Sequence, residues 1–186
     1  MDYSRFINEL TRTAEQFFEG RSELLDRVIA FLCENLSSGQ KILIFGNGGS
    51  ASQAQHFAAE LVNKFLKVRS PLPAISLTTD TSVLTSIAND FSFDLVFSRQ
   101  IEALGEKGDM AIGLSTSGNS QNMIFALETA RKKGLKTIAV TGNGGGKMAS
   151  VCDYLLDVPS EVTPRIQEVH LLILHIMAEE IEKRLC

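Results

Sequence analysis

Cysteine is scarce in this chain of 186 residues, and its few cysteines lie far apart. Cys33, Cys152 and Cys186 are odd in number and form no CxxC pair. Disulfide frameworks and zinc ribbons need paired, closely spaced cysteines, so neither is expected here. Unpaired cysteines of this kind are typical of a reducing compartment, and we expect a cytoplasmic location.

The chain also lacks a concentration of positive charge. It has 18 Lys and Arg residues against 22 Asp and Glu residues, which gives a net charge of −4, and it has no basic cluster. Proteins bind nucleic acids largely by neutralising phosphates, so nucleic acid is not an expected partner. With only 4 prolines, 14 glycines and a 44% hydrophobic share, the composition excludes disordered and collagen-like classes.

No segment is apolar over the length that a membrane anchor requires. Residues 1–10 are interrupted by charged and polar side chains, unlike a signal peptide. The most apolar stretch, residues 171–178, is far shorter than the roughly 20 residues that span a bilayer. We therefore expect a soluble protein with no membrane partner.

Five short apolar runs, each bounded by turn residues, predict the strands of a parallel sheet. None alternates strictly between apolar and polar residues, which is typical of strands that are covered on both faces. Helix-length segments lie between them, and this alternation predicts right-handed crossovers. The predicted fold class is α/β, a doubly wound sandwich around a five-stranded parallel sheet. The five runs are residues 42–45, 74–77, 110–114, 137–140 and 154–158.

Apolar residues recur at three- and four-residue steps in the other segments, which predicts helices. Gly20 is expected to separate two N-terminal helices, and Pro164 suits the first turn of a long C-terminal helix. The absence of a linker or repeat predicts a single domain over 1–186, with N-terminal helices in 1–37 and an α/β core in 40–186. Helices are expected at residues 2–19, 21–36, 50–66, 81–104, 120–134, 145–151 and 163–185.

The loop after the first predicted strand, residues 46–51, reads Gly-Asn-Gly-Gly-Ser-Ala and matches the dinucleotide fingerprint GxGxxG/A. Glycines at such a position let backbone N–H groups approach a ligand at a helix N-terminus. NAD is not favoured, because its ribose needs an acidic residue about 20 positions on, whereas Asp80 lies 34 positions after Gly46. A tight turn with positive φ is the alternative.

The loop after the third predicted strand, residues 115–120, reads Ser-Thr-Ser-Gly-Asn-Ser. Hydroxyl groups and free N–H groups at a helix N-terminus can hold a phosphate monoester without an arginine. The alternative is that Ser120 is only a helix cap and the rest is a hydroxyl-rich turn. A third glycine-rich loop, residues 142–146, has no hydroxyl beyond Thr141, and a flexible turn is expected there.

Two histidines, a glutamate and a glutamine could share one ligand. His56 and Glu60 are four residues apart on a largely apolar helix, so they share a face, and a buried glutamate needs a partner or a task. Gln167 and His175 share a broad face of the last helix, whereas His170 points about 140° away from His175. The four could bind a divalent cation, but their spacing is no zinc motif. A surface Glu–His pair and a core histidine are the alternatives.

A set of motifs in chain order carries a resemblance to a known family. They read Gly46-Asn-Gly-Gly-Ser-Ala, Gln55-His-Phe-Ala-Ala-Glu60, Leu77-Thr-Thr-Asp-Thr, Asn89-Asp90, Phe97-Ser-Arg-Gln, Ser115-Thr-Ser-Gly-Asn-Ser and Arg165-Ile-Gln-Glu-Val-His. Together they resemble the bacterial phosphoheptose isomerases of the sugar isomerase (SIS) domain superfamily. The resemblance covers about residues 40–185, the N-terminal helices also fit it, and it implies a flavodoxin-like SIS domain.

The resemblance implies an isomerase that converts sedoheptulose 7-phosphate to D-glycero-D-manno-heptose 7-phosphate, the first step towards the ADP-heptose of lipopolysaccharide. It implies a homotetramer whose active sites lie between subunits. It also implies one zinc ion per subunit, held by His56, Glu60, Gln167 and His175. The substrate contacts that it implies are Asn47, Gly48, Gly49, Asn89, Asp90, Ser115, Thr116, Ser117, Ser120 and Gln167.

Such an isomerase moves a proton between C1 and C2 of the sugar through an enediol. Glu60 is the candidate base, His175 is the candidate acid/base at the sugar oxygens, and residues 115–120 would anchor the phosphate. A glutamate bound tightly to zinc is a poor base. The metal would therefore loosen during turnover, polarise the substrate oxygens, or be partly structural.

One residue departs from the family pattern. Lys64 stands where the family commonly has arginine, so the charge is kept but the bidentate fork is lost. Two alternatives to the isomerase are a non-catalytic SIS-domain regulator that binds a replication initiator protein and an isomerase of another phosphosugar. The regulator lacks the counterparts of Glu60 and His175, and both residues are present here.

Overall fold

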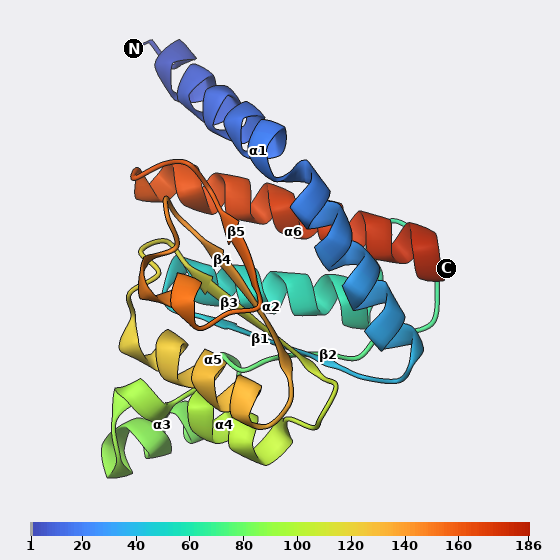
Figure 1. Cartoon of the computed structure of the whole chain (residues 1–186), viewed down its shortest axis with the longest axis vertical. Coiled ribbons are helices and arrows are strands. Elements are labelled where there is room, and N and C mark those ends of the chain that lie inside the picture. Colours follow the sequence, from blue (N-terminus) through green and yellow to red (C-terminus); the bar gives the residue numbers. More distant parts are fainter. Residues whose placement is uncertain (1) are drawn as a thin grey trace.

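The computed structural model describes residues 2–186, which form one parallel sheet flanked by helices (Figure 1). The strand order is β2-β1-β3-β4-β5, the order of flavodoxin-like doubly wound folds. All four strand pairings are parallel, as expected. The strands are β1 (Ile42–Gly46), β2 (Ala74–Ser76), β3 (Met110–Ser115), β4 (Lys136–Thr141) and β5 (Tyr154–Asp157).

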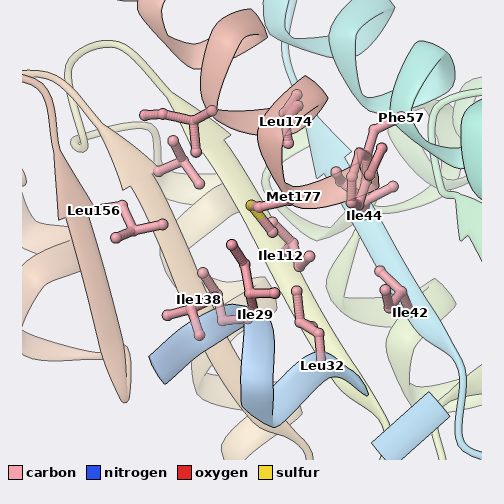
Figure 2. Packing of buried hydrophobic residues seen from close by; sticks show 14 of the residues in the cluster. Ile29, Leu32, Ile42, Ile44, Phe57, Ile112, Ile138, Leu156, Leu174 and Met177 are labelled. Atoms are coloured by element: carbon pink, nitrogen blue, oxygen red, sulfur yellow. The ribbon is translucent and has the colours of Figure 1, made fainter. Parts of the chain in front are cut away.

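Each face of the sheet is covered by its own layer of helices. Ile42 and Ile44 of β1 pack into a cluster with α1, α2 and α6, which Figure 2 shows together with Ile112 of β3. The alternate residues Leu43 and Phe45 pack into a second cluster with α3, α4 and α5. Successive side chains of a strand point to opposite faces, so a sheet covered twice needs apolar residues at every position. This is why the strand sequences do not alternate.

The helices agree with the expected segments in most places. The long last helix begins and ends where predicted, with Pro164 in its first turn. The helices are α1 (Ser4–Ser37), α2 (Gly49–Val62), α3 (Thr81–Asp90), α4 (Ser98–Leu104), α5 (Gln121–Lys132) and α6 (Thr163–Leu185). None of the helices within residues 2–186 is both long and apolar enough to cross a membrane.

Three helix predictions were wrong. The N-terminal region is one helix of 34 residues and not two, since Gly20 lies inside α1; a helix tolerates an interior glycine at about 1 kcal/mol. The segment 81–104 is divided, because Ser92 is extended and caps the short 3₁₀ helix η1 (Phe93–Leu95) between α3 and α4. The segment 145–151 forms only the 3₁₀ helix η2 (Gly146–Ser150).

Helix α6 is anchored to the sheet by a buried histidine. The side chain of His170 is fully buried, and its Nε2 lies 3.0 Å from the carbonyl oxygen of Thr141 at the end of β4. A carbonyl only accepts, so Nε2 carries the proton and donates it. Burial lowers the pKa of His170 to about 4, because the charged imidazolium cannot be solvated there.

Stability is therefore expected to decline in mild acid. The unfolded chain binds a proton at His170 below about pH 6.5 while the folded chain does not, so the free energy of unfolding falls as pH is lowered towards 4. Between about pH 8 and pH 5 this single group contributes about 2 kcal/mol to that decline. His170→Asn should remove this part of the slope in urea unfolding experiments. An unchanged slope would show that His170 is protonated equally in both states.

Candidate active site

The loops that follow β1 and β3 lie at the point where the strand order reverses, which is where ligands bind in open α/β sheets. Asn47 in the first loop exchanges two side-chain hydrogen bonds, of 3.0 and 2.9 Å, with Asn122 in the first turn of α5. Asn122 is almost fully buried. Sequence analysis missed Asn122, and its only signal was a polar residue on an apolar helix face. The amide pair fixes the two loops relative to each other.

Glycines in the first loop are required by the atoms around them. Gly48 has a φ of +53°, which L side chains rarely adopt. A Cβ at Gly46 would lie 2.8 Å from the Cβ of Ser50, and one at Gly49 would lie 2.6 Å from Nε2 of Gln167. The tight turn expected as the alternative is therefore real. It also brings the Gln167 amide of α6 to the N-terminus of α2.

The hydroxyl loop, residues 115–120, forms its own internal hydrogen bonds. Ser115 Oγ accepts from the backbone N–H of Gly118 at 3.1 Å, and Ser117 Oγ accepts from that of Asn119 at 3.2 Å. Ser120 is the N-cap residue of α5, yet within the described residues its side chain makes no capping hydrogen bond. Its hydroxyl is therefore not used as a plain helix cap, which was the alternative interpretation of this loop.

The third glycine loop packs against the hydroxyl loop, contrary to the prediction of a flexible turn. Gly142 N–H donates to the carbonyl of Thr116 at 3.1 Å, and Met148 N–H donates to that of Gly118 at 2.9 Å. A Cβ at Gly118 would lie 2.0 Å from the carbonyl oxygen of Gly145, and one at Gly142 would lie 2.4 Å from that of Thr116. Two backbones touch directly here, so the glycines serve close packing.

A cavity of about 240 Å³ opens beside the hydroxyl loop. Most of its wall is polar, and two of its residues, Thr116 and Ser117, belong to the loop itself. Hydroxyl and amide groups of this kind suit a hydrated, polar ligand better than an apolar one, and the Glu161 carboxylate disfavours an anion on its side of the cavity. The lining residues are Thr116, Ser117, Asn143, Ser160, Glu161, Thr163 and Ile166.

Helices α2 and α6 bring the predicted titratable side chains together. His56 Nε2 lies 3.4 Å from Oε1 of Glu60 and 2.8 Å from Nε2 of His175. The side chain of Glu60 is 20% exposed, so it is largely covered but reachable. The ring of Phe65 stacks on His175, with centroids 5.6 Å apart and planes at 25°. A carboxylate and two imidazoles can hold and move protons in this arrangement.

Two of the predicted substrate contacts are not brought to the loops after β1 and β3 by their own chain. Asn89 and Asp90 end α3, are exposed, and share a hydrogen bond of 2.8 Å from Asn89 Nδ2 to Asp90 Oδ1. Neither side chain hydrogen bonds to the loops after β1 and β3 in the part of the chain that the structure describes. Lys64, just beyond α2, is exposed as well.

Comparison with known proteins gives consistent matches over nearly the whole chain. The phosphoheptose isomerase of Geobacter sulfurreducens is 50% identical over 186 residues, covering 96% of this chain and 98% of that protein. That of Aquifex aeolicus is 50% identical over 182 residues, with coverages of 98% and 95%. The solved phosphoheptose isomerase of Neisseria gonorrhoeae has a TM-score of 0.92 and 43% identity, covering 97% of this chain and 96% of that one.

The SIS domain family model also matches, over residues 5–142. That span contains the glycine loop, the hydroxyl loop and the face of α2 that carries His56 and Glu60. The strand order is that of the flavodoxin-like fold which the resemblance implied. The chain therefore belongs to the SIS domain family and, within it, to the phosphoheptose isomerases.

Proposed function

We propose that this isomerase interconverts sedoheptulose 7-phosphate and D-glycero-D-manno-heptose 7-phosphate at the cluster of His56, Glu60 and His175. The observation that carries the proposal is the convergence of a reachable carboxylate and two imidazoles from α2 and α6. Its relatives of about 50% identity are phosphoheptose isomerases. The product is the first intermediate on the way to the ADP-heptose of lipopolysaccharide or other surface glycans. The enzyme acts in the cytoplasm.

The chemistry is a proton transfer between neighbouring carbons. Glu60 takes a proton from C1 of the ketose, which leaves an enediol, and returns it to C2 of the same intermediate. His175 gives a proton to the oxygen on C2 and takes one from the oxygen on C1. The proton count balances, and the carbonyl has moved from C2 to C1. Nε2 of His56 lies 2.8 Å from Nε2 of His175 and can share its proton while no ion occupies these two nitrogens.

The hydroxyl loop binds the distant phosphate. Ser120 has a hydroxyl that does not cap α5 within the described structure, and the N-terminus of that helix favours an anion. Ser115, Thr116 and Ser117 contribute further hydroxyl groups, and Asn47, Gly48 and Gly49 contact the sugar from the first loop. Binding energy collected at the phosphate then holds the reacting carbons against Glu60.

The donor set suits zinc chemically, but the structure does not gather all four ligands around one point, because the Gln167 amide lies beside Gly49 at the N-terminus of α2, two turns before His56. His56, Glu60, His175 and the Gln167 amide offer nitrogen and oxygen ligands that zinc accepts. Among residues 2–186, no three His, Cys, Asp or Glu side chains are already spaced as a metal site. Two ligands of a tetrahedral zinc lie about 3.3 Å apart, whereas the two histidine nitrogens are 2.8 Å apart. When bound, the ion would polarise the substrate oxygens.

A homotetramer with shared active sites is part of the same proposal. Helices α1 and α6 border a cavity of about 760 Å³ whose wall is largely apolar, and Phe6 and Ile7 of α1 are exposed near the chain's N-terminus. An apolar groove bordered by acidic side chains, here Glu15, Glu19 and Glu168, is a feature of protein contact surfaces. Asn89 and Asp90 stand apart from the loops of their own chain, which supports their contacting substrate bound to a neighbouring subunit.

The non-catalytic regulator is not favoured as a function. It binds a protein partner and needs no proton-transfer pair, whereas Glu60 and His175 are both present here and both lie close to Nε2 of His56. The relatives at about 50% identity are isomerases. Turnover of the zinc-supplemented protein with sedoheptulose 7-phosphate, followed by NMR, tests the choice directly. Absence of product from a folded, zinc-loaded tetramer would favour the regulator.

Glu60→Gln should abolish turnover without unfolding the protein. The amide keeps the shape of the carboxylate but cannot take the C1 proton, so kcat should fall by about 10²- to 10⁴-fold. NMR detection of heptose 7-phosphate measures this, and gel filtration checks the assembly. Glu23→Gln, on the exposed surface of α1, is the matched control and should behave as wild type. Near-normal activity of Glu60→Gln would refute the assigned base.

Ser120→Ala should weaken phosphate binding selectively. Loss of one hydrogen bond to a charged group should raise KM by about tenfold or more, with a smaller change in kcat. Inhibition by inorganic phosphate should weaken in parallel. Ser38→Ala, whose hydroxyl bonds a carbonyl at the end of α1, provides the control. An unchanged KM together with unchanged phosphate inhibition would exclude Ser120 as a phosphate ligand.

Removal of bound metal should lower activity, and zinc should restore it. His175→Asn should also reduce the zinc content, because it removes one of the four proposed ligands. The zinc content is measured by atomic emission spectroscopy on protein dialysed against buffer without chelator. Wild-type protein should hold about one zinc per chain, as a four-ligand site predicts. Full activity of wild-type protein at negligible metal content would contradict the zinc proposal.

A further inference from the structure

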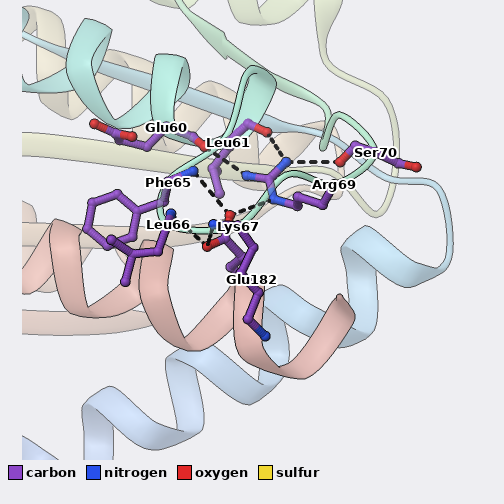
Figure 3. Close-up of polar contacts among 8 residues, drawn as sticks. All are labelled: Glu60, Leu61, Phe65, Leu66, Lys67, Arg69, Ser70 and Glu182. Atoms are coloured by element: carbon purple, nitrogen blue, oxygen red, sulfur yellow. Dashed lines mark hydrogen bonds and ion pairs between the residues drawn. The ribbon is translucent and has the colours of Figure 1, made fainter.

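A buried ion pair lies directly behind the candidate active site. Glu182, near the end of α6, is only 1% exposed. Its carboxylate accepts from three consecutive backbone N–H groups, those of Phe65 at 3.1 Å, Leu66 at 2.8 Å and Lys67 at 2.8 Å. Figure 3 shows this segment, which follows α2, folded over the carboxylate. One side chain of α6 therefore fixes the path of the chain beyond α2.

Arg69 completes the arrangement from the other side. Its Nε donates to Glu182 at 3.1 Å, and its side chain is 3% exposed. Nη1 donates to the carbonyls of Leu61 and Ser70, and Nη2 donates to the carbonyl of Glu60 at 2.8 Å (Figure 3). The last carbonyls of a helix have no partner within the helix. Arg69 supplies partners for two carbonyls at the C-terminal end of α2.

The pair remains charged in spite of its burial. Burial opposes the negative charge of Glu182, yet the three N–H groups and Arg69 hold the pKa of the carboxyl below its usual range. Replacing a buried ion pair with well-packed apolar residues is often neutral or even stabilising. Stability alone is therefore a weak reason for such a pair, whereas fixing the geometry of several backbone groups requires polar partners.

The backbone groups held by this pair belong to residues of the active site. Phe65 donates its N–H to Glu182, while its ring stacks on the ring of His175. Glu60 gives its carbonyl to Arg69, while its carboxylate faces His56. His175 and Glu182 are seven residues apart on α6, which places them on the same side of the helix two turns apart.

We propose that Glu182 and Arg69 are positioning residues for the isomerisation, holding Glu60 and the Phe65–His175 stack in their mutual arrangement. Neither touches the substrate. The inference rests on the proposed roles of Glu60 and His175. It adds that the buried pair of Glu182 and Arg69, called the clamp below, sets the geometry of these two residues.

The chain offers a matched control at the opposite end of the sheet. Asp109, 2% exposed, pairs with Lys41 at 2.6 Å and accepts from the backbone N–H groups of Lys41 and Glu106. These residues precede β1 and β3, so they lie at the amino ends of the strands, away from the loops of the site. Asp109→Asn removes a buried charge of the same kind without touching α2 or α6.

Glu182→Gln should impair catalysis more than substrate binding. The amide NH₂ would face N–H donors, so the segment 65–67 would shift and kcat should fall by about 10- to 100-fold, as expected for a small misplacement of reacting groups. KM should change by less than about threefold, because the phosphate site is untouched. Arg69→Lys should show a smaller loss in the same direction, and it carries the test if Glu182→Gln does not fold. Asp109→Asn should lose stability but keep its kcat.

A spectroscopic readout separates positioning from general destabilisation. The ring of Phe65 shifts the proton resonances of the His175 imidazole. These resonances are identified by their absence from the spectrum of His175→Asn. Glu182→Gln and Arg69→Lys should move these resonances towards their positions in Phe65→Leu, and Asp109→Asn should not. The effects of Glu182→Gln and Phe65→Leu on kcat should also be non-additive.

The outcomes distinguish this inference from the proposed function. An inactive wild-type protein would refute the proposed function itself. An active wild type in which the clamp variants keep both their kcat and the His175 resonances would overturn the positioning role alone. An equal loss of kcat in Asp109→Asn would do the same.

Discussion

The structure depends on the reversal of strand order between β1 and β3. From these two neighbouring strands the chain leaves towards opposite faces of the sheet, to α2 on one side and α5 on the other. Two adjacent connections that diverge in this way leave a crevice at the carboxyl edge, with both helix N-termini beside it. Asn47 and Asn122 join the two sides through paired amides. Every group assigned to substrate in the loops after β1 and β3 is placed by this single topological feature.

The groups proposed to bind the substrate and those proposed to transfer protons lie on different elements. The loops after β1, β3 and β4 contribute mainly backbone and hydroxyl groups, and their glycines let main chains touch, as where Gly118 meets Gly145. The side chains proposed as acid and base lie instead on α2 and α6, two helices of the same layer. Helices hold side chains more rigidly than loops do. The geometry of Glu60, His56 and His175 thus depends on how these two helices pack, and Arg69 with Glu182 fixes that packing at one end.

The sequence predicted the sheet well because its strands carry a local signal. A strand covered on both faces must be apolar throughout, and each of the five runs was read from its own residues. The errors arose where contacts with distant parts of the chain overrode the local conformational preference. Gly20 is a helix breaker by propensity, yet packing of α1 against α6 and β5 carries the helix through it. The loop 142–146 looked flexible because its glycines were judged without the neighbouring loop that they contact.

The residues that sequence reasoning missed are those whose role depends on a partner far away in the sequence. Asn122 pairs with Asn47 across 75 positions, and Glu182 holds N–H groups about 115 positions earlier. In the sequence each is one polar residue in a helix. The four-residue separation of His56 and Glu60, by contrast, is local and could be recognised directly in the sequence. The convergence of His175 on that pair is a contact across 119 positions; the residues alone left it open beside a core histidine, and the family resemblance implied it.

The place of α6 in the chain has a consequence for synthesis. This helix supplies Gln167, His175 and Glu182, yet it follows all five strands, so the residues of every strand are synthesised before these side chains. Until then the apolar face meant for α6 stays open, and the segment after α2 has no carboxylate to fold around. Closing contacts over such separations is slow compared with local structure. The site is therefore complete only after this last helix has been synthesised and has packed against the sheet.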